Sequence, residues 1–500
     1  MEYLSTTTLL YGLPLSLTVY TVLWILYCRT LHPLARVPGP FWASITRVWY
    51  IYRIYRGDGE LVERALHRKY GPLIRIAPNE VSSSDPAAVP EIYRNHNPLQ
   101  KTDFYSVWSS GNTFSEQSDL FTCLDENEHK EKRKTITTVY SLSNVVKNEE
   151  NIQQCTLLLL QKLEKLAKRR QPFDIGEWLH WYAFDVIGKL TFGSMFGFLE
   201  REEDHHSFIG ALDALLPITA ISGTAPTYYR PVLMSAAFSI PSIRRGLAGM
   251  VNDTLALIAQ RKDQLAAGNA VPHDLLQQML DLAHEKGEKI NFSDKEASLH
   301  SWANMVAGSD TTAIALKACV YYLSRNPTCQ SKLHAEVEAA NATISSPIKY
   351  TESLRLPYLC ACIKEAMRLF PSVAMSLPRM SPREGLELSG FHVPAGYRVG
   401  VNAAVVQYDE GVYGADTERF VPERWLVEDK KVKEMERAFL TFGAGTRTCS
   451  GKNISLVQIY TAVPEIVRKF VVVAETEREW TTYNTWFNKQ SDMGVGLRVR

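Results

Sequence analysis

The longest apolar stretch of the chain lies at its N-terminus, where residues 3–28 contain no charged side chain. Leucine, valine, isoleucine and tryptophan recur through it, and about 20 apolar residues are enough for a helix to cross a bilayer. A cleaved signal peptide would carry a basic segment before a shorter apolar run, whereas Glu2 precedes this one. The pattern therefore predicts a single transmembrane helix that is retained, with Pro14 as the position of a kink.

Basic residues follow this stretch at Arg29, His32 and Arg36. Because positively charged flanks stay on the cytoplasmic side of a membrane, we expect the rest of the chain to lie in the cytosol. Three prolines between positions 33 and 40 restrict the backbone and predict a stiff, non-helical hinge.

No glycine–serine linker, charge block or repeat divides the remaining residues. The 500-residue chain is therefore predicted to consist of an anchor at 1–28, a hinge at 29–42 and one large domain at 43–500. Its 55 Lys and Arg against 54 Asp and Glu give a formal net charge of +1, which argues against a nucleic-acid partner. The eight cysteines show neither zinc-like spacing nor the pattern of a disulfide framework.

Two periodicities occur in the large domain. Short alternating segments bounded by glycine and proline predict strands at 74–76, 80–83, 386–388, 391–393 and 399–401. Longer segments with helical signals outnumber them, and the clearest are residues 294–325, 356–370 and 452–470. The predicted fold class is mainly α with small β-sheets (α+β).

The helix predicted at 294–325 begins with a capping box formed by Ser293 and Glu296. At 1.5 Å per residue it would be roughly 48 Å long. Its centre, residues 307–312, reads A-G-S-D-T-T. Glycine inside a helix costs about 1 kcal/mol relative to alanine, and threonine is a weak helix former, so we expect these residues to have a compensating role.

Cys449 lies in a glycine-rich stretch, 442–451, directly before the helix predicted at 452–470. The N-terminus of that helix would stabilise a thiolate and lower the pKa of the cysteine, which suits it to bind a metal. The glycines let the backbone approach a large, flat group, and Arg447 offers a charged, planar fork to a carboxylate. A lone cysteine is usually a small buried hydrophobe, but this combination favours a metal ligand.

Residues 442–451 read F-G-A-G-T-R-T-C-S-G and match every fixed position of the signature F-x-x-G-x-R-x-C-x-G. The chain thereby resembles the cytochrome P450 family of haem-thiolate monooxygenases, over essentially its whole length. The resemblance implies the cytochrome P450 fold, preceded by a single N-terminal transmembrane helix, with the haem-thiolate catalytic domain at 43–500. The overall pattern is similar to fungal microsomal members of the pisatin demethylase kind.

The resemblance implies haem b as the cofactor, with Cys449 as the axial ligand of its iron. Further cofactor-binding residues carried over from the family motifs are Phe442, Gly443, Arg447, Arg133 and Arg379. His129 stands four residues before Arg133, where the family usually has tryptophan, and is expected to contact the same haem propionate.

Two further motifs of the family are present. Asp310 and Thr311 match the acid–alcohol pair, which relays protons from a widened turn of the long helix to oxygen bound at the haem. Glu365 and Arg368 match the E-x-x-R pair, and Arg424 supplies the third member of a buried structural triad that supports the cysteine loop.

Several segments are similar to parts of the family that contact substrate. A loop predicted at 101–123 corresponds to a cover of the active site, and the apolar, proline-punctuated stretch 207–250 predicts a mobile, membrane-facing lid. The residues expected to line the substrate site are Phe104, Trp108, Phe114, Trp302, Val306, Ala307, Val373, Ala374, Trp486 and Phe487.

The resemblance implies a monooxygenase that inserts one oxygen atom from O2 into a hydrophobic small molecule. Electrons would come from NADPH through NADPH–cytochrome P450 reductase, with cytochrome b5 as an optional donor, and Lys130, Lys132 and Lys134 are candidates for the docking surface. The expected location is the endoplasmic reticulum membrane, single-pass, with the catalytic domain on the cytoplasmic side. The expected role is a tailoring step on a polyketide, terpenoid or alkaloid of secondary metabolism.

Two alternatives remain open. One is a reductase-independent haem-thiolate isomerase or dehydratase, although such relatives typically lack the acid–alcohol pair. The other is a non-catalytic haem-binding membrane protein, in which the proton relay would have no use. The motifs do not separate hydroxylation, epoxidation, demethylation and multistep oxidation, because one oxidant performs all four and the shape of the pocket decides.

Overall fold

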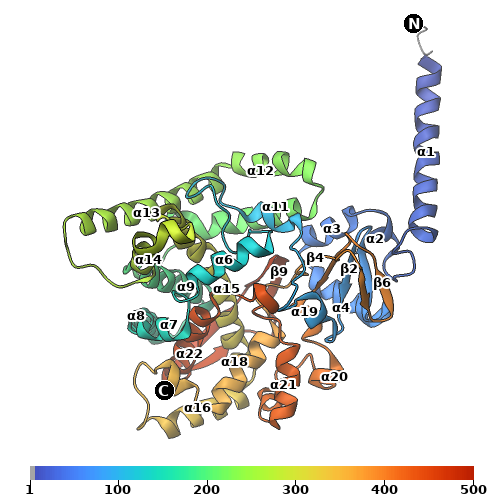
Figure 1. Ribbon diagram of the computed structural model, residues 1–500. Coiled ribbons are helices and arrows are strands. Elements are labelled where there is room, and N and C mark those ends of the chain that lie inside the picture. The colour runs from blue at the N-terminus through green and yellow to red at the C-terminus, as the bar shows by residue number, and fades with distance from the viewer. Residues whose placement is uncertain (1–5) are drawn as a thin grey trace.

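The computed structural model describes residues 6–500, so the first residues of the predicted span, 3–5, lie outside the described part. Helix α1 (Thr6–Thr30) continues through Pro14 and stands clear of the body of the protein (Figure 1). Between Gly12 and Thr30 it is apolar and long enough to cross a membrane, and only 6% of these residues are buried. The remaining elements form a mainly helical body with small sheets, which confirms the predicted fold class.

Polar contacts hold the end of α1 against the body. The residues between α1 and α2 (Phe41–Ile45) form turns rather than a helix. The buried guanidinium of Arg75 donates a hydrogen bond to the carbonyl oxygen of Cys28 at 3.0 Å. The indole nitrogen of Trp24 donates to the carbonyl oxygen of Ile45, also at 3.0 Å. The end of α1 is therefore docked on the first strand rather than connected by a free linker.

The strands form four small sheets in the described part of the chain. The largest has the order β1-β2-β7-β4, in which β1 and β2 are antiparallel and β2 and β7 are parallel. Its strands are β1 (Leu73–Ala77), β2 (Glu80–Ser83), β4 (Arg379–Met380) and β7 (Arg398–Val401). The others pair β5 (Leu386–Leu388) with β6 (Phe391–Val393), β9 (Thr481–Thr485) with β10 (Phe487–Ser491), and β3 (Phe173–Asp174) with β11 (Gly494–Val499) and β8 (Phe470–Ala474).

Helix α15 (Asp294–Arg325) runs through the centre of the body and has the bounds and the capping box that the sequence predicts. It packs against α9 (Ile175–Phe192), α18 (Pro357–Leu369) and α22 (Lys452–Lys469). A Cβ atom at Gly308 would lie 2.8 Å from the side chain of Ile187. Glycine therefore lets α15 and α9 approach closely, which offsets part of its cost inside the helix.

Three helices cover one end of the body. They are α11 (Phe208–Thr224), α12 (Arg230–Ser239) and α13 (Pro241–Ala266), and we call them the lid. Pro231 and Pro241 occupy first helical turns, where a missing N–H removes no hydrogen bond. Helix α12 runs along the edge of the body on the side toward which α1 extends (Figure 1).

The segment predicted as a loop at 101–123 contains one short 3-10 helix, η1 (Asp103–Trp108), and is otherwise irregular. Arg133 lies on helix α6 (Glu126–Ile136). The remaining α-helices are α3 (Val48–Arg56), α4 (Gly59–Tyr70), α5 (Ala88–Ile92), α7 (Leu142–Lys147), α8 (Glu149–Arg169), α10 (Phe198–Arg201), α14 (Leu275–Ile290), α16 (Pro327–Ala340), α17 (Tyr350–Ser353), α19 (Ala403–Val406), α20 (Glu410–Tyr413) and α21 (Asp429–Arg437).

Candidate active site

A cavity of about 550 Å³ lies between α15, the lid and the cysteine loop, residues 442–451. The lid contributes mainly leucine, methionine, valine and phenylalanine to its wall. The charged lining residues come from α6, from the segment before it and from the cysteine loop, and they are Lys101, Asp119, Arg133 and Arg447. The cavity therefore has an apolar side under the lid and a cationic side near the cysteine.

The cysteine loop folds back on itself in front of α22. The backbone N–H of Cys449 donates to the carbonyl oxygen of Phe442 at 2.9 Å, which closes the loop. Gly443 and Gly445 have φ angles of 70° and 69°, a region that favours glycine. A Cβ atom at Gly445 would also collide with the backbone of Tyr93. These two glycines are therefore required by the turn itself.

Cys449 is the only cysteine that lines the cavity in the described part of the chain, and its side chain is exposed to that space. Burial raises the pKa of its thiol, while the N–H groups of Gly451 and Lys452 and the guanidinium of Arg133 lower it. The expected effect of the helix N-terminus is present, but burial outweighs it, so the prediction of a lowered pKa is wrong for the protein alone. Coordination to a metal would itself deprotonate the thiol.

Arg133 and Arg447, both expected to bind haem propionates, line the cavity from α6 and from the cysteine loop. Arg133 donates to the carbonyl oxygen of Thr448 at 2.7 Å. Arg447 pairs with Glu126 at 2.7 Å and donates to the carbonyl oxygen of Cys123 at 2.8 Å. Both guanidinium groups thus hold the cysteine loop in position and make the adjacent wall of the cavity positively charged.

His129 and Arg379 differ in their relation to the cavity. His129 lines it from α6, and burial together with Arg447 and Lys101 lowers its pKa to about 3, so its imidazole is neutral. Arg379 is buried behind the wall and donates to the hydroxyl oxygen of Tyr105 at 2.9 Å. Of the expected cofactor-binding residues, Arg379 is therefore the one that the structure places outside the lining.

Lys101 is a lining residue that the sequence did not single out. Its backbone forms a β-bridge with Arg379, and its ammonium group lies 4.2 Å from the ring centroid of Tyr105. The ammonium donates to the carbonyl oxygen of Phe121 at 2.5 Å and forms no ion pair in the described structure. Burial, with Arg379 and Arg447 nearby, holds its pKa well below the usual range. The sequence could not identify Lys101 as a lining residue, because a single lysine in an irregular segment belongs to no motif.

These features fit haem. Lys101, Arg133 and Arg447 line one side of the cavity. Of the carboxylates nearby, Glu126 is already paired with Arg447, and Asp119 accepts hydrogen bonds from the backbone N–H groups of Phe121 and Thr122. A buried ammonium without a carboxylate partner is costly, so a ligand that carries carboxylates would complete this side. Cys449 supplies a thiol to the same cavity, and the glycine turn allows a flat group to approach the backbone. A planar iron complex with two carboxylates meets all of these conditions.

On α15, Thr311 and Asp310 lie on different sides of the helix. Thr311 lines the cavity, and its hydroxyl group donates to the carbonyl oxygen of Ala307 at 2.8 Å. Asp310 is 1% exposed and does not line the cavity. Helix α15 is α-helical throughout residues 307–312, without the widened turn that the family resemblance implies.

The carboxylate of Asp310 is held on the far side of α15 by two partners, an imidazole and an ammonium group. One oxygen accepts a hydrogen bond from Nε2 of His180 on α9, and the other lies 3.1 Å from the ammonium of Lys489 on β10. Burial raises the pKa of Asp310, but Lys489 and His180 together hold it well below the usual range. Asp310 is therefore ionised and turned away from the cavity.

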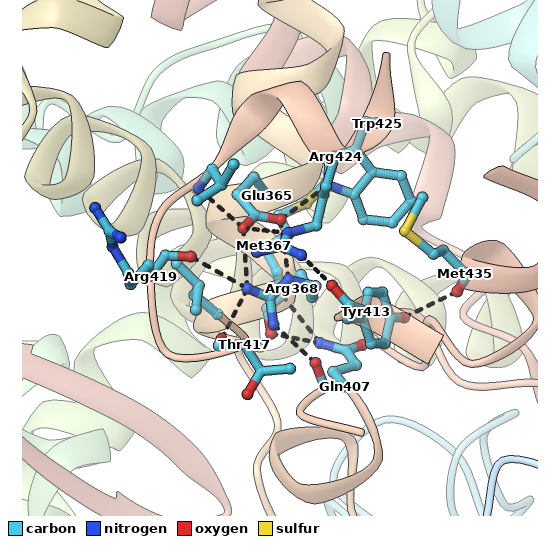
Figure 2. A network of polar contacts seen from close by, with 12 residues as sticks. Glu365, Met367, Arg368, Gln407, Tyr413, Thr417, Arg419, Arg424, Trp425 and Met435 are labelled. Atoms are coloured by element: carbon cyan, nitrogen blue, oxygen red, sulfur yellow. Dashed lines mark hydrogen bonds and ion pairs between the residues drawn. The ribbon is translucent and has the colours of Figure 1, made fainter. Parts of the chain in front are cut away.

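The E-x-x-R pair forms a buried network (Figure 2). Arg368 donates to both carboxylate oxygens of Glu365 at 2.9 Å, and Arg424 donates to one of them, also at 2.9 Å. The indole nitrogen of Trp425 donates to the other oxygen at 2.9 Å. Glu365 and Arg368 are fully buried, so each charge depends on its partners.

Gln407 connects this network to the cysteine loop. Its side-chain amide donates to the carbonyl oxygen of Arg368 at 2.8 Å, and its side-chain oxygen accepts from the hydroxyl group of Thr441 at 3.1 Å. Thr441 directly precedes Phe442. The network therefore fixes the point at which the chain enters the loop.

Most of the residues expected at the substrate site do line the cavity. They are Trp108, Phe114, Trp302, Val306, Ala307, Val373, Trp486 and Phe487. Phe104 and Ala374 are buried behind the wall instead. Phe104 packs against Trp486, whose backbone has a φ of 89°, a strained value for a bulky side chain. Similarity to the family's segments did not distinguish the residues that line the cavity from those that pack behind them.

The chain is similar to known proteins over most of its length. The family model described as Cytochrome P450 matches residues 38–493. The chain is 41% identical to "Cytochrome P450 monooxygenase gsfF" of Penicillium aethiopicum, over 96% of each chain. It is 35% identical to "Cytochrome P450 monooxygenase cicH" of Emericella nidulans, again over 96% of each, and 32% identical to a "Pisatin demethylase" of Fusarium vanettenii, over 96% of this chain and 94% of that protein.

Proposed function

Since this chain belongs to the cytochrome P450 family and is a monooxygenase, we propose that it inserts one oxygen atom of O2 into a hydrophobic small molecule. The electrons come from NADPH through a reductase. The observation that carries the proposal is that Cys449 and Thr311 line one cavity, whose remaining wall is cationic near the cysteine and apolar under the lid.

Cys449 would hold haem through its iron, and the haem would supply the binding and activation of O2, with the thiolate favouring cleavage of the O–O bond. The residues of the chain prepare that site. Arg133, Arg447 and Lys101, which line the cavity, would hold the two carboxylates of the cofactor, while Arg379 supports Lys101 through the β-bridge. The lid side of the cavity excludes water from the reaction.

Thr311 moves protons at the cavity wall. Its hydroxyl group can donate to an acceptor in the cavity and receive a proton in turn, because its present partner is only the Ala307 carbonyl of its own helix. Asp310, the residue before Thr311, would pass protons to the Thr311 hydroxyl group. To do so, its carboxylate must first rotate away from His180 and Lys489.

The substrate is an uncharged or weakly polar, largely apolar molecule. The lid contributes Leu212, Leu215 and Leu216, and α15 contributes Trp302 stacked on Phe114 at a centroid distance of 5.3 Å. No charged residue of the lid or of α15 lines the cavity in the described structure. This composition agrees with a tailoring oxidation in secondary metabolism, and one fungal relative is named a pisatin demethylase.

The protein acts at a membrane. Helix α1 is the anchor. Apolar side chains exposed on the lid helix α12, Val232 (68%) and Phe238 (46%), and Tyr228 (71%) just before that helix provide a second contact with lipid. We place the chain in the endoplasmic reticulum membrane as a single-pass protein with its catalytic domain, residues 43–500, on the cytoplasmic side. Lys130 and Lys134 are exposed for reductase docking, whereas Lys132 is paired with Glu128 at 2.9 Å.

The carbon monoxide difference spectrum of the dithionite-reduced protein in microsomes tests the proposal. We expect the Soret band of thiolate-ligated ferrous haem and, with purified reductase, oxygen uptake that depends on NADPH. A band typical of histidine-ligated haem contradicts the assignment of Cys449. Turnover without NADPH would favour an isomerase or dehydratase, and haem binding without oxygen uptake would favour a non-catalytic role.

A further inference from the structure

Three side chains with metal-binding atoms meet where the chain enters the lid. They are His205 and His206, in the 3-10 helix η2 (His205–Ser207) that leads into α11, and Asp253 on α13. Nε2 of His205 lies 2.9 Å from Oδ2 of Asp253, and Nε2 of His206 lies 3.2 Å from the same oxygen. None of the three residues lines the cavity, so this group is separate from the haem site.

The separations of these atoms are close to those of a tetrahedral zinc site. Zinc binds imidazole nitrogen and carboxylate oxygen at about 2.0 to 2.2 Å, so two ligand atoms at the tetrahedral angle are about 3.4 Å apart. Both nitrogen–oxygen distances lie within about half an ångström of that value. An ion can therefore enter between the three atoms after a small outward shift of the side chains.

The backbone brings the two histidines against α13 at a conformational cost. His206 and Ser207 have φ angles of 56° and 54°, a region that residues with a side chain seldom occupy. On α13, a Cβ atom at Gly249 would lie 2.8 Å from the imidazole ring of His206, and one at Gly246 would lie 2.8 Å from the carbonyl oxygen of Ser207. Gly246, Gly249 and Asp253 share one face of the helix, at spacings of three and four residues. Glycine therefore makes room for the histidine turn beside Asp253.

The charges around Asp253 leave a place for a cation. In the described part of the chain its carboxylate forms no ion pair with lysine or arginine and accepts hydrogen bonds from the two imidazoles. The side chains of Asp253 and His206 are 35% and 41% exposed, so an ion can reach them from solvent. The competing cation is Arg201 on α10, which donates to Nδ1 of His205 and lies 3.3 Å from Nε2. Because Arg201 is exposed, it can move away and leave Nδ1 to take the proton that Nε2 gives up on coordination.

We propose that His205, His206 and Asp253 form a binding site for one Zn²⁺ ion, with water as the fourth ligand. Two imidazoles and one carboxylate suit zinc, whereas Mg²⁺ and Ca²⁺ prefer oxygen ligands. The ion holds η2, and with it the start of α11, against α13. Both helices line the cavity, α11 through Leu212 and α13 through Val251, so the bound ion fixes the spacing of two helices that form the apolar wall.

Zinc binding to the full-length haem protein, purified without a polyhistidine tag, tests the proposal. Equilibrium dialysis against micromolar Zn²⁺, followed by elemental analysis, should find one Zn²⁺ per chain that a large excess of Mg²⁺ does not displace. Asp253→Asn and His206→Gln should each weaken binding at least about a hundredfold, the upper end of the loss caused by changing groups that only orient metal ligands. His284→Gln is the control, since His284 contacts Asp294 and does not belong to the group.

Two further measurements distinguish ligation from a merely structural role of these side chains. Arg201→Met should tighten zinc binding about fivefold, because the ion no longer has to displace a hydrogen-bonded guanidinium from His205. The zinc K-edge X-ray absorption of the wild type should show two imidazole nitrogens at about 2.0 Å. Amide hydrogen exchange over residues 208–216 should slow when Zn²⁺ is added to the wild type and stay unchanged in Asp253→Asn.

Four outcomes would overturn the inference. They are a wild type that binds no Zn²⁺, binding by Asp253→Asn or His206→Gln as tight as that of the wild type, an Arg201→Met variant that binds no more tightly, and an absorption spectrum without imidazole ligands. Each variant is first checked for its fold by circular dichroism. The absorption spectrum and the hydrogen exchange of the wild type test the site even where a variant does not fold.

Discussion

The guanidinium group of Arg133 donates a hydrogen bond to the backbone carbonyl oxygen of Thr448 at 2.7 Å. Thr448 directly precedes Cys449, so the bond ties α6 to the cysteine loop across 315 residues of the chain. The same group lowers the pKa of the Cys449 thiol against the effect of burial. Arg133 therefore positions the proposed iron ligand and also lines the cavity.

The first prediction concerns that ligand. Cys449→Ser should remove the Soret band of thiolate-ligated haem from the reduced carbon monoxide complex, because serine offers no sulfur to the iron. Cys360→Ser is the control, since Cys360 is half-buried and outside the cavity lining. An unchanged band in Cys449→Ser would show that another residue ligates the iron.

Thr311→Ala should keep the haem and its carbon monoxide spectrum but lower the product formed per NADPH at least about tenfold. A positioned proton-transfer group contributes a factor of about 10² to 10⁴, and water in the cavity replaces part of it. The control is Thr156→Ala, which removes the same kind of hydroxyl-to-carbonyl bond, here to Ile152, from α8. Equal ratios of product to NADPH in both variants would exclude Thr311 from the proton path.

Glu365→Gln should destabilise the holoprotein by about 3 to 5 kcal/mol, because it leaves the buried charge of Arg368 without its partner. Urea unfolding, followed by haem absorbance and by circular dichroism, measures the change. Glu434→Gln breaks an exposed pair with Lys431 and should cost less than about 1 kcal/mol. Similar losses in the two variants would mean that burial does not decide the strength of the Glu365 network.

Lys101→Met should release haem about tenfold faster, measured by transfer to an excess of apomyoglobin. A hydrogen bond to a charged group contributes about 1.5 kcal/mol, which corresponds to that factor. Lys101→Arg keeps the charge and should release haem at nearly the rate of the wild type. If both variants lose haem equally fast, the packing of Lys101 against Tyr105 matters and its charge does not.

The full-length protein should stay in membranes that are washed with alkaline carbonate. A protein without residues 1–22 should be released by that wash. The shortened chain keeps the contacts of Trp24 and Cys28 with the body, so its fold should be retained. It should still sediment with membranes before the carbonate wash, through the exposed lid, and Val232→Asp should weaken this association. Continued resistance to carbonate would place the membrane attachment elsewhere.

Much of the fold follows from local sequence. The bounds of α15 are specified by the Ser293–Glu296 capping box and by the proline after Asn326, and α22 starts after the glycine that follows Cys449. The predicted strands occur because alternation and glycine or proline boundaries act within a few residues. The apolar α1 is likewise a property of one continuous stretch.

The candidate site was predicted where its residues lie in contiguous motifs. The cysteine loop and the Glu365–Arg368 spacing are of this kind, since a turn or a helix face brings their members together. Arg379, Phe104 and Ala374 were expected on the cavity wall and lie behind it, because the sequence gives no measure of depth.

Only the tertiary structure decided on which side of α15 the carboxylate of Asp310 lies and which groups it contacts. Adjacent residues of an α-helix point about 100° apart, so the A-G-S-D-T-T motif alone allowed Asp310 and Thr311 to face the cavity together. The packing of α9 and β10 against α15 placed His180 and Lys489 on one side and left the cavity on the other. Lys101 joined the site through a β-bridge to a strand 278 residues away. The sequence by itself determined what local hydrogen bonding and periodicity specify, whereas these charge partners come from distant segments that only the packed fold brings within a few ångströms.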